Sequence, residues 1–142
     1  METKETNQEE LQKTLLELEM HKRRLEAITQ RMQMIEATIF ELDDTAKAID
    51  AMKNEKKGNE ILVSIGSGSY FKAAVKDKEK ILIGAGAGIS IEKTTDEAKK
   101  TLESRKEGLH KIADELQKNA SELSERMSYL SGLYEDLARG MQ

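Results

Sequence analysis

Two long heptad-patterned segments, in a chain without proline, limit most strongly what this sequence can fold into. In the first, from about Leu11 to about Asn54, apolar residues recur at alternating spacings of three and four. That spacing is typical of the seam of a left-handed coiled coil, and the absence of proline permits a long uninterrupted helix. The predicted seam residues are Leu11, Thr14, Leu18, His21, Leu25, Ile28, Met32, Ile35, Ile39, Leu42, Ala46 and Ile49.

The second segment, from about Thr95 to Met141, carries a leucine at every seventh residue from Leu102 to Leu137. The matching d positions are weaker, and apolar e positions compensate. Thr94 and Glu97 resemble a capping box that marks the helix start. The d residues are Arg105, Ile112, Asn119, Arg126, Leu133 and Gly140, and the e residues are Ala113, Ala120, Met127, Tyr134 and Met141. The two segments are of similar length, so a middle block that returns the chain would pair them antiparallel.

The middle block contains four short β-rich runs, at 61–65, 70–75, 81–83 and 89–93, separated by glycine-rich or charged turns. This spacing predicts two β-hairpins. Residues 65–68 and 83–86 look like equivalent places of an internal repeat. The expected fold is therefore α+β, mainly α, in one structural domain: an N-terminal coiled-coil helix (1–56), two β-hairpins forming an oligomerisation block (57–94), and a C-terminal coiled-coil helix (95–142).

This chain has little material for a core of its own. Charged residues make up 35% and apolar residues 37% of the chain, with aromatics at 4%, whereas ordinary domains carry roughly a quarter charged and nearly half apolar residues. Four short strands are too few to be stable unaided, and their open edges need partners. We therefore expect the strands of several subunits to close into a β-barrel on oligomerisation. The candidate oligomerisation residues are Ile61, Val63, Ile65, Phe71, Val75, Ile81, Ile83, Ile89 and Ile91.

Composition also argues against several classes of function. A net charge of −4 disfavours a general nucleic-acid binder. The chain has no cysteine, which excludes thiolate metal sites and fits a reducing cytosol. Its apolar runs are far shorter than the roughly 20 residues that span a bilayer, and the first residues lack the apolar region of a signal peptide. The expected protein is cytoplasmic and contacts neither nucleic acid nor a membrane.

No motif for catalysis or for a cofactor is present. The glycine run 84–88 reads G-x-G-x-G and leads into a strand, whereas a dinucleotide fingerprint leads into a helix. Glycines in that setting are typical of turns and bulges. His21 and His110 would lie in different halves of an antiparallel hairpin, so we expect no shared metal site. The predicted protein is not an enzyme and uses no metal or cofactor.

Apolar residues persist where the two ends of an antiparallel hairpin would meet. Helix ends are commonly polar, so this apolar end suggests a binding surface for other proteins. Leu15, Met127, Tyr134 and Met141 lie off the predicted a/d seam, and flexible methionine and leucine side chains suit varied apolar partners. The candidate binding residues at this arm tip are Leu11, Leu15, Leu18, Met127, Leu130, Leu133, Tyr134, Leu137 and Met141.

The order of long helix, two hairpins and long helix resembles the alpha subunit of prefoldin, in its archaeal form, over nearly the whole chain. The most specific stretches are ILVSIGSGSYFKA at 61–73 and ILIGAGAGISIEK at 81–93. Two hairpins rather than one favour the alpha class over the beta class.

The resemblance implies an ATP-independent co-chaperone. Two alpha and four beta subunits would form a double β-barrel with coiled-coil arms. The arm tips would capture unfolded client proteins and deliver them to a group II chaperonin. Two alternatives remain open at this point: a prefoldin-like structural subunit that forms filaments, and a coiled-coil adaptor for one defined partner.

Overall fold

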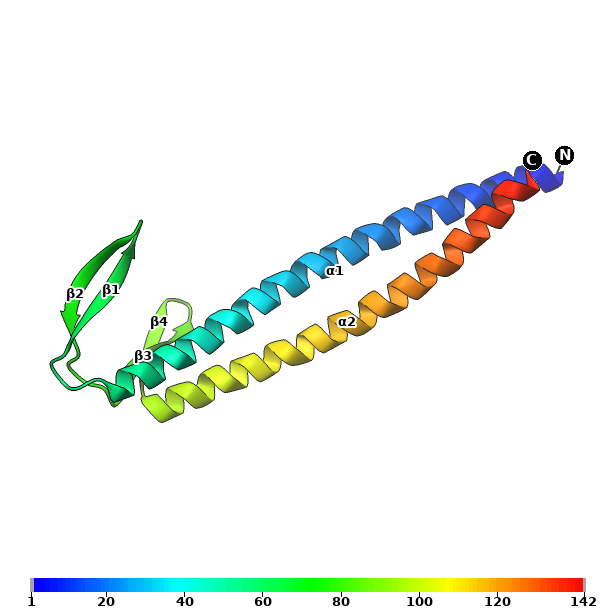
Figure 1. The fold of residues 1–142 in the computed structure, drawn as a ribbon. Coiled ribbons are helices and arrows are strands. Elements are labelled where there is room, and N and C mark those ends of the chain that lie inside the picture. The colour runs from blue at the N-terminus through cyan, green and yellow to red at the C-terminus, as the bar shows by residue number, and fades with distance from the viewer. Residues whose placement is uncertain (1, 142) are drawn as a thin grey trace. The chain divides into compact units, whose positions relative to one another are not determined.

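The computed structural model describes residues 2–141. Along the chain, one long helix precedes four short strands and a second long helix follows them, which confirms the predicted α+β, mainly α, fold class (Figure 1). The β-barrel is a property of an assembly and stays a prediction. The elements are, in order, α1 (Glu2–Asn54), β1 (Glu60–Gly66), β2 (Ser69–Ala74), β3 (Lys80–Gly86), β4 (Ile89–Thr94) and α2 (Thr95–Gly140).

The described residues form two compact units. The helical unit comprises the described parts of Met1–Ala37 and Leu109–Gln142, and the hairpin unit comprises Thr38–Gly108. The expected domain boundaries follow the order of the elements along the chain, and they stay a prediction. Residues 1 and 142, which that division included, lie outside the described residues.

Helix α1 begins at Glu2, nine residues earlier than the predicted start near Leu11. The expected start was wrong because residues 2–10 contain neither glycine nor proline, and several of them are good helix formers. Asn7, one heptad before Thr14, is half-buried and extends the seam. Thr14 is buried, and its hydroxyl donates to the Glu10 carbonyl at 2.8 Å, which satisfies this polar seam position.

All predicted seam residues of α1 are buried or half-buried, so the heptad register of this helix is confirmed. The predicted register of α2 is wrong in part. Every d position except Leu133 is exposed, whereas the e row, expected to compensate for the weak d row, is half-buried from Ala113 to Tyr134. The exposed d residues are Arg105, Ile112, Asn119, Arg126 and Gly140. The seam of α2 therefore combines the leucine row with the e row. Burying arginine or asparagine is costly, while alanine and methionine pack without unpaired polar groups.

The start of α2 follows the predicted capping box. The Glu97 amide donates to Thr94 Oγ1 at 3.2 Å, and the Thr94 amide donates to Glu97 Oε2 at 3.3 Å. Nearby ion pairs join α1 and α2 within the hairpin unit and show that the two helices run antiparallel there. Lys99 pairs with Asp50 at 2.7 Å and Lys106 with Asp43 at 3.0 Å, as antiparallel helices require.

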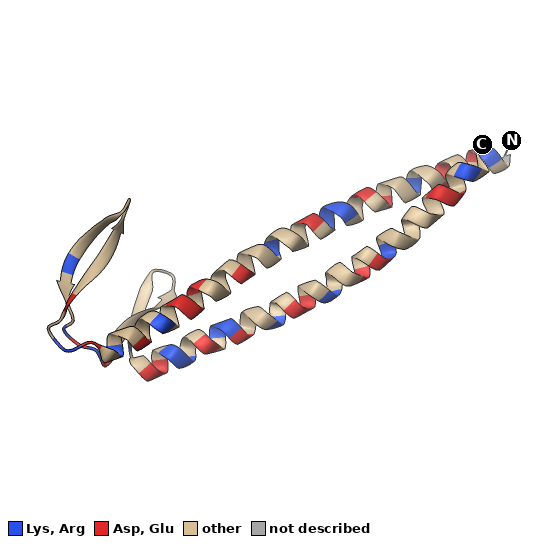
Figure 2. Ribbon diagram, viewed as in Figure 1, with Lys and Arg blue, Asp and Glu red and all other residues tan. Residues whose placement is uncertain are grey.

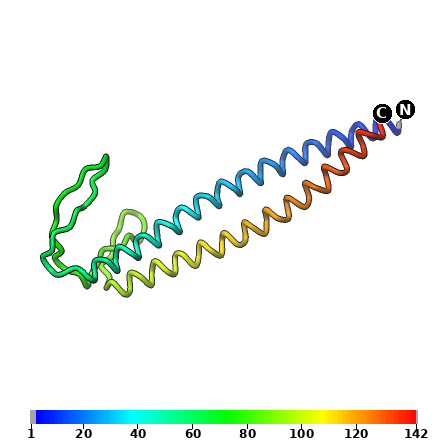
Figure 3. The backbone as a smooth tube through the Cα atoms, in the orientation of Figure 1, coloured from blue at the N-terminus to red at the C-terminus, as the bar shows by residue number. Residues whose placement is uncertain are grey.

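The strands form two separate two-stranded antiparallel sheets, β1–β2 and β3–β4, visible as two loops of the backbone trace (Figure 3). Each contains a register shift, between Ser64 and Gly66 in one and between Gly84 and Gly86 in the other. The hairpins repeat each other at an offset of 20 residues, from Glu60 opposite Ala74 to Lys80 opposite Thr94.

The turns of the two hairpins show the same repeat. Ser67 and Ala87 both have φ of 51°, and Gly66 and Gly86 have φ of 100° and 99°. The predicted equivalence of residues 65–68 with 83–86 is therefore wrong by two positions. Gly86, not Gly84, takes the left-handed backbone conformation that glycine tolerates best.

The core of the hairpin unit lies where β3 meets both helices. Ile83 of β3 packs with Ile49 of α1 and with Ala98 and Leu102 of α2. Leu42 and Ile81 pack against this cluster and remain partly exposed. Within the described chain, neither helix has a stretch apolar enough to cross a membrane.

Candidate functional site

Hairpin β1–β2 presents an apolar face that is exposed at its centre and half-buried at the end nearer the helices in sequence, at Ile61 and Ala73. Its odd-numbered residues share one face because side chains alternate along a strand. Val63 is 44% exposed and Phe71, directly opposite it, is 66% exposed. We call this surface the β1–β2 face, and it consists of Ile61, Val63, Ile65, Phe71 and Ala73.

The equivalent face of β3–β4 is partly covered by the chain's own helices. Ile83, which corresponds to Val63, is only 8% exposed. Arg105 Nη2 donates to the Gly84 carbonyl at 2.6 Å, and Lys93 Nζ donates to Thr101 Oγ1 at 2.9 Å. Apolar packing and two polar contacts therefore fasten β3–β4 to α2.

The predicted oligomerisation residues thus fall into two environments. Val63, Ile65, Phe71, Ile89 and Ile91 are exposed, and Ile61 and Ile81 are half-buried. Val75 and Ile83 are buried within the chain itself. Leu62, Tyr70 and Leu82 are also exposed, although the sequence analysis did not include them. They lie on the even-numbered face, which simple alternation assigns to solvent. Figure 2 shows that charged residues are dense along the helices and sparse on the strands.

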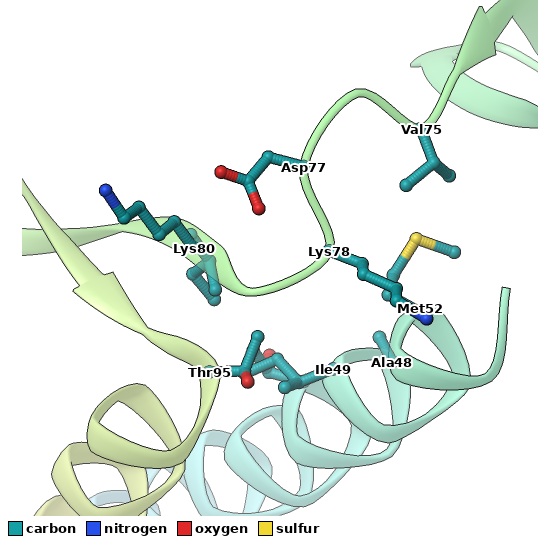
Figure 4. A pocket seen from close by; sticks show the side chains of 10 residues that line it. Ala48, Ile49, Met52, Val75, Asp77, Lys78, Lys80 and Thr95 are labelled. Atoms are coloured by element: carbon teal, nitrogen blue, oxygen red, sulfur yellow. The ribbon is translucent and has the colours of Figure 1, made fainter. Parts of the chain in front are cut away.

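A small apolar pocket of about 200 Å³ lies in the hairpin unit. Ala48, Ile49 and Met52 of α1 line it together with Val75, as Figure 4 shows. Asp77, at its rim, accepts a hydrogen bond from the Glu79 amide at 2.9 Å. This pocket offers no arrangement of a nucleophile with a base.

The predicted arm-tip residues belong to the helical unit, and most of them pack within it. Leu130 is only 2% exposed, whereas Leu15 is 49% and Met141 38% exposed. Met127 and Tyr134 were expected off the seam but lie in it, because the α2 seam uses the e row. The half-buried members of the set are Leu11, Leu18, Met127, Leu133, Tyr134 and Leu137.

The sequence does not single out four exposed apolar residues of the helical unit, which are Leu16, Met20, Met34 and Tyr129. Leu16 and Met20 of α1 are 65% and 64% exposed, and one helical turn separates them. With Leu15 they form what we call the α1 patch. Tyr129 of α2 is 61% exposed, and the Arg126 guanidinium carbon lies 5.2 Å from its ring centroid. These residues face away from the seam, so heptad periodicity does not single them out.

A polar layer crosses the helical unit at Glu17. Arg126 donates to Glu17 Oε1 from Nε at 3.2 Å and from Nη2 at 3.1 Å, and this bond lowers the pKa of the Glu17 carboxyl. His21 Nε2 lies 3.3 Å from the same oxygen, while its Nδ1 is buried and unpaired. No cluster of side chains that could hold a metal ion occurs among the described residues.

These features define a coiled-coil subunit with one exposed and one half-covered β-hairpin. A family model described as "Prefoldin subunit" matches residues 21–136, so the chain belongs to the prefoldin family. Members of this family are non-enzymatic chaperone subunits, in agreement with the expectation that the chain is not an enzyme.

Its relatives include alpha subunits from archaea, which confirms the resemblance. The chain is 32% identical over 91 residues to prefoldin subunit alpha of Methanopyrus kandleri, over 64% of this chain and 58% of that one. It is 35% identical over 85 residues to the subunit of Methanococcus aeolicus, over 60% and 57%. For Methanosarcina barkeri, the identity is 32% over 97 residues, 66% and 67% of the two chains. The matches to the first two relatives thus span little more than half of their length.

Solved structures show the same fold. A filamentous PFD from Methanocaldococcus jannaschii, solved by cryo-electron microscopy, matches with a TM-score of 0.75 and 22% identity, covering 82% of this chain and 96% of that one. The prefoldin beta subunit from Thermococcus strain KS-1 matches with a TM-score of 0.56 and 17% identity, covering 89% and 90%.

Proposed function

We propose that this chain is an alpha-class prefoldin subunit that acts as an ATP-independent co-chaperone. It captures unfolded proteins with apolar residues of its helical unit and delivers them to a group II chaperonin. The observation that carries the proposal is the α1 patch, Leu15, Leu16 and Met20, which is exposed on a helix otherwise rich in charge. Exposed apolar clusters of this kind typically mark interaction sites.

The proposed partners in assembly are beta-class prefoldin subunits, with two alpha and four beta subunits joined through a β-barrel. The exposed β1–β2 face supports this, because an isolated two-stranded hairpin is at best marginally stable in water. The complex acts in the cytoplasm and contacts neither nucleic acid nor a membrane.

The affinity of one arm for a client is low. Each fully buried leucine contributes about 1.5–3 kcal/mol, and ordering the client offsets part of this gain. Several arms on one unfolded chain raise the avidity by roughly 10²–10⁴. The proposed mechanism therefore depends on assembly.

The experiment compares complexes that contain the full chain or the chain without residues 1–18 and 127–142. The deletion removes no residue of the hairpin unit, so assembly persists. Protection of a chemically denatured model protein against aggregation is lost. Moderate salt changes protection little, because the contacts are apolar.

A point variant locates the contact more sharply. Leu15→Ser, Leu16→Ser and Met20→Ser together reduce protection, since all three residues are exposed and contribute little to folding. Phe40→Ser is the matched control, because Phe40 is 68% exposed but lies in the hairpin unit. If the complex whose chain lacks residues 1–18 and 127–142 still protects the model protein fully, the proposal is contradicted and the client site lies elsewhere in the complex.

A further inference from the structure

The two linkers on either side of hairpin β1–β2 are joined to each other. Residues 55–59 precede β1, and residues 75–79 follow β2. The Gly58 amide donates to the Val75 carbonyl at 2.7 Å, and the Val75 amide donates to the Asn59 carbonyl at 3.0 Å. These backbone hydrogen bonds hold the two linkers together, so their side chains contribute to one surface.

This surface is basic, although the chain as a whole is acidic. Residues 53–59 and 75–80, which we call the linker surface, contain six lysines and three acidic residues, whereas the chain has a net charge of −4 (Figure 2). Lys53 pairs with Asp96. The other five lysines are exposed and form no ion pair among residues 2–141; they are Lys56, Lys57, Lys76, Lys78 and Lys80. Unpaired charges of one sign on one surface favour a partner of the opposite sign.

Local hydrogen bonds hold two of the three acidic side chains within their own linkers. The Glu55 carboxylate accepts a hydrogen bond from Asn59 Nδ2, and the Asp77 carboxylate accepts one from the Glu79 amide, both at 2.9 Å. The lysine ammonium groups therefore stay available to carboxylates from outside the chain.

The apolar pocket of about 200 Å³ opens within this basic surface. Val75 of the linker lines it together with Ile49 and Met52 of α1, and Lys78 and Lys80 also contribute to its lining (Figure 4). An apolar cavity of about 150 Å³ is large enough to bind benzene. The pocket therefore has room for one aromatic side chain, surrounded by positive charge.

We propose that the linker surface docks an acidic segment of a partner protein that carries one aromatic anchor residue. The aromatic ring enters the pocket, and carboxylates on either side of it pair with Lys78 and Lys80. In such interfaces a buried anchor carries most of the binding energy, while exposed charges set specificity. The inference goes beyond client capture, because the linker surface belongs to the hairpin unit and the α1 patch to the helical unit.

The test follows the binding of short peptides to the full chain by NMR of the methionine methyl groups. The probe is the capped peptide Asp-Glu-Phe-Asp-Glu. The Met52 methyl resonance shifts because Met52 lines the pocket, whereas the resonance of Met20 in the α1 patch does not. Replacing the peptide's Phe with Ala weakens binding at least tenfold, since burial of the ring is lost. The basic peptide Lys-Lys-Phe-Lys-Lys also binds at least tenfold more weakly, because its charges are repelled.

Variants of the chain separate the charge from the pocket. Lys78→Glu combined with Lys80→Glu weakens binding of the acidic peptide by roughly tenfold and strengthens binding of the basic peptide. Ala48→Leu fills the pocket from the exposed side of α1 and removes the advantage of Phe over Ala, while the charge preference persists. The matched control is Lys47→Glu combined with Lys111→Glu, an equal charge change at exposed sites outside the linker surface, which leaves the affinity within about twofold.

Equal affinity for the acidic and basic peptides, or for the Phe and Ala peptides, overturns the proposal. A shift of Met20 in place of Met52 also overturns it, because the peptide then lies on the α1 patch. The titration is repeated on the complex with the beta-class subunit, where the Met52 shift persists; its loss shows that assembly covers the linker surface and contradicts a separate docking site. If the peptide binds as expected and client protection does not depend on the α1 patch, only the proposed function is wrong.

Discussion

Hairpins β1–β2 and β3–β4 share a backbone but differ in their surroundings. Val63 and Ile83 occupy the same place in the repeat, yet Val63 is 44% exposed and Ile83 only 8%. The difference arises in the helices, where Ile49, Ala98 and Leu102 meet β3. A repeated local sequence therefore specifies the shape of each hairpin, while the residues of the helices specify which hairpin is covered.

The comparison separates two roles. The chain stabilises β3–β4 itself, through the core cluster and the Arg105 contact to Gly84. No comparable cluster covers β1–β2 among residues 2–141, so its apolar face is available to other subunits. The same change should thus affect folding in one hairpin and assembly in the other.

The largest expected effect comes from placing a carboxylate at the two equivalent sites. Ile83→Asp buries an unpaired charge and lowers the free energy of unfolding by about 3–5 kcal/mol. In Val63→Asp the new carboxylate is half exposed in the isolated chain, so the free energy of unfolding changes by about 1 kcal/mol or less. The same substitution prevents assembly with the beta-class subunit. Urea unfolding followed by circular dichroism measures the first effect, and the mass of the complex measures the second.

If Ile83→Asp and Val63→Asp destabilise the isolated chain equally, the two sites do not differ in burial as described. Normal assembly of the Val63→Asp variant shows instead that the β1–β2 face is not an interface.

A smaller effect is expected for Arg105→Ala. Removing the guanidinium leaves the Gly84 carbonyl without its donor, at a cost of about 1 kcal/mol. Amide hydrogen exchange should accelerate in β3–β4 and stay unchanged in β1–β2. Lys100→Ala is the control, since Lys100 is exposed on the same helix. Faster amide exchange in both hairpins would contradict the account that the Arg105 contact stabilises β3–β4 alone.

The two turns should respond alike, because their local geometry is the same. Ser67 and Ala87 both have φ of 51°, a conformation that costs a residue with a side chain about 1–2 kcal/mol. Ser67→Gly and Ala87→Gly relieve this strain, but glycine also raises the conformational entropy of the unfolded chain. The net result is a gain of about 0.5 kcal/mol in the free energy of unfolding for each variant. Exchange of the turn amides measures both gains. Opposite signs in the two hairpins contradict an equivalent repeat.

The smallest expected effect is a pH dependence beside β4. Hydrogen bonding from Lys53 lowers the pKa of the Asp96 carboxyl below its ordinary value of 3.8. A depressed folded-state pKa stabilises the fold above pH 3.8, and this contribution is lost as the pH falls through the lowered value. Asp96→Asn should flatten the thermal stability curve between pH 4 and pH 2, on the order of a degree. If the slope of thermal stability against pH is unchanged in Asp96→Asn, Lys53 does not stabilise the ionised Asp96 carboxylate.

Periodicity predicted more of the fold than of the surface. The seam of α1, the strands and the capping box at Thr94 follow from spacing alone. The leucine row of α2 and its compensating e row also follow from spacing. The d row was wrong because Arg105 and Asn119 occupy it, and the cost of burying polar groups decides between the d and e rows. The α1 start was missed because residues 2–10 lack a seam of strong apolar residues.

Exposure could not be read from the strands. Val63 and Ile83 are alike in sequence, and only the positions of Ile49 and Leu102 in three dimensions make one of them buried. Leu16 and Met20 were missed for a related reason, since a search for seam positions ignores outward-facing residues.

The most direct test of the account is the mass of the complex formed on co-expression with a beta-class prefoldin subunit. Native mass spectrometry should show one closed species with two copies of this chain and four beta subunits. Val63→Asp in the same experiment should leave uncomplexed subunits. A wild-type chain that remains monomeric beside the beta-class subunit, or that forms polymers of many masses, contradicts the account.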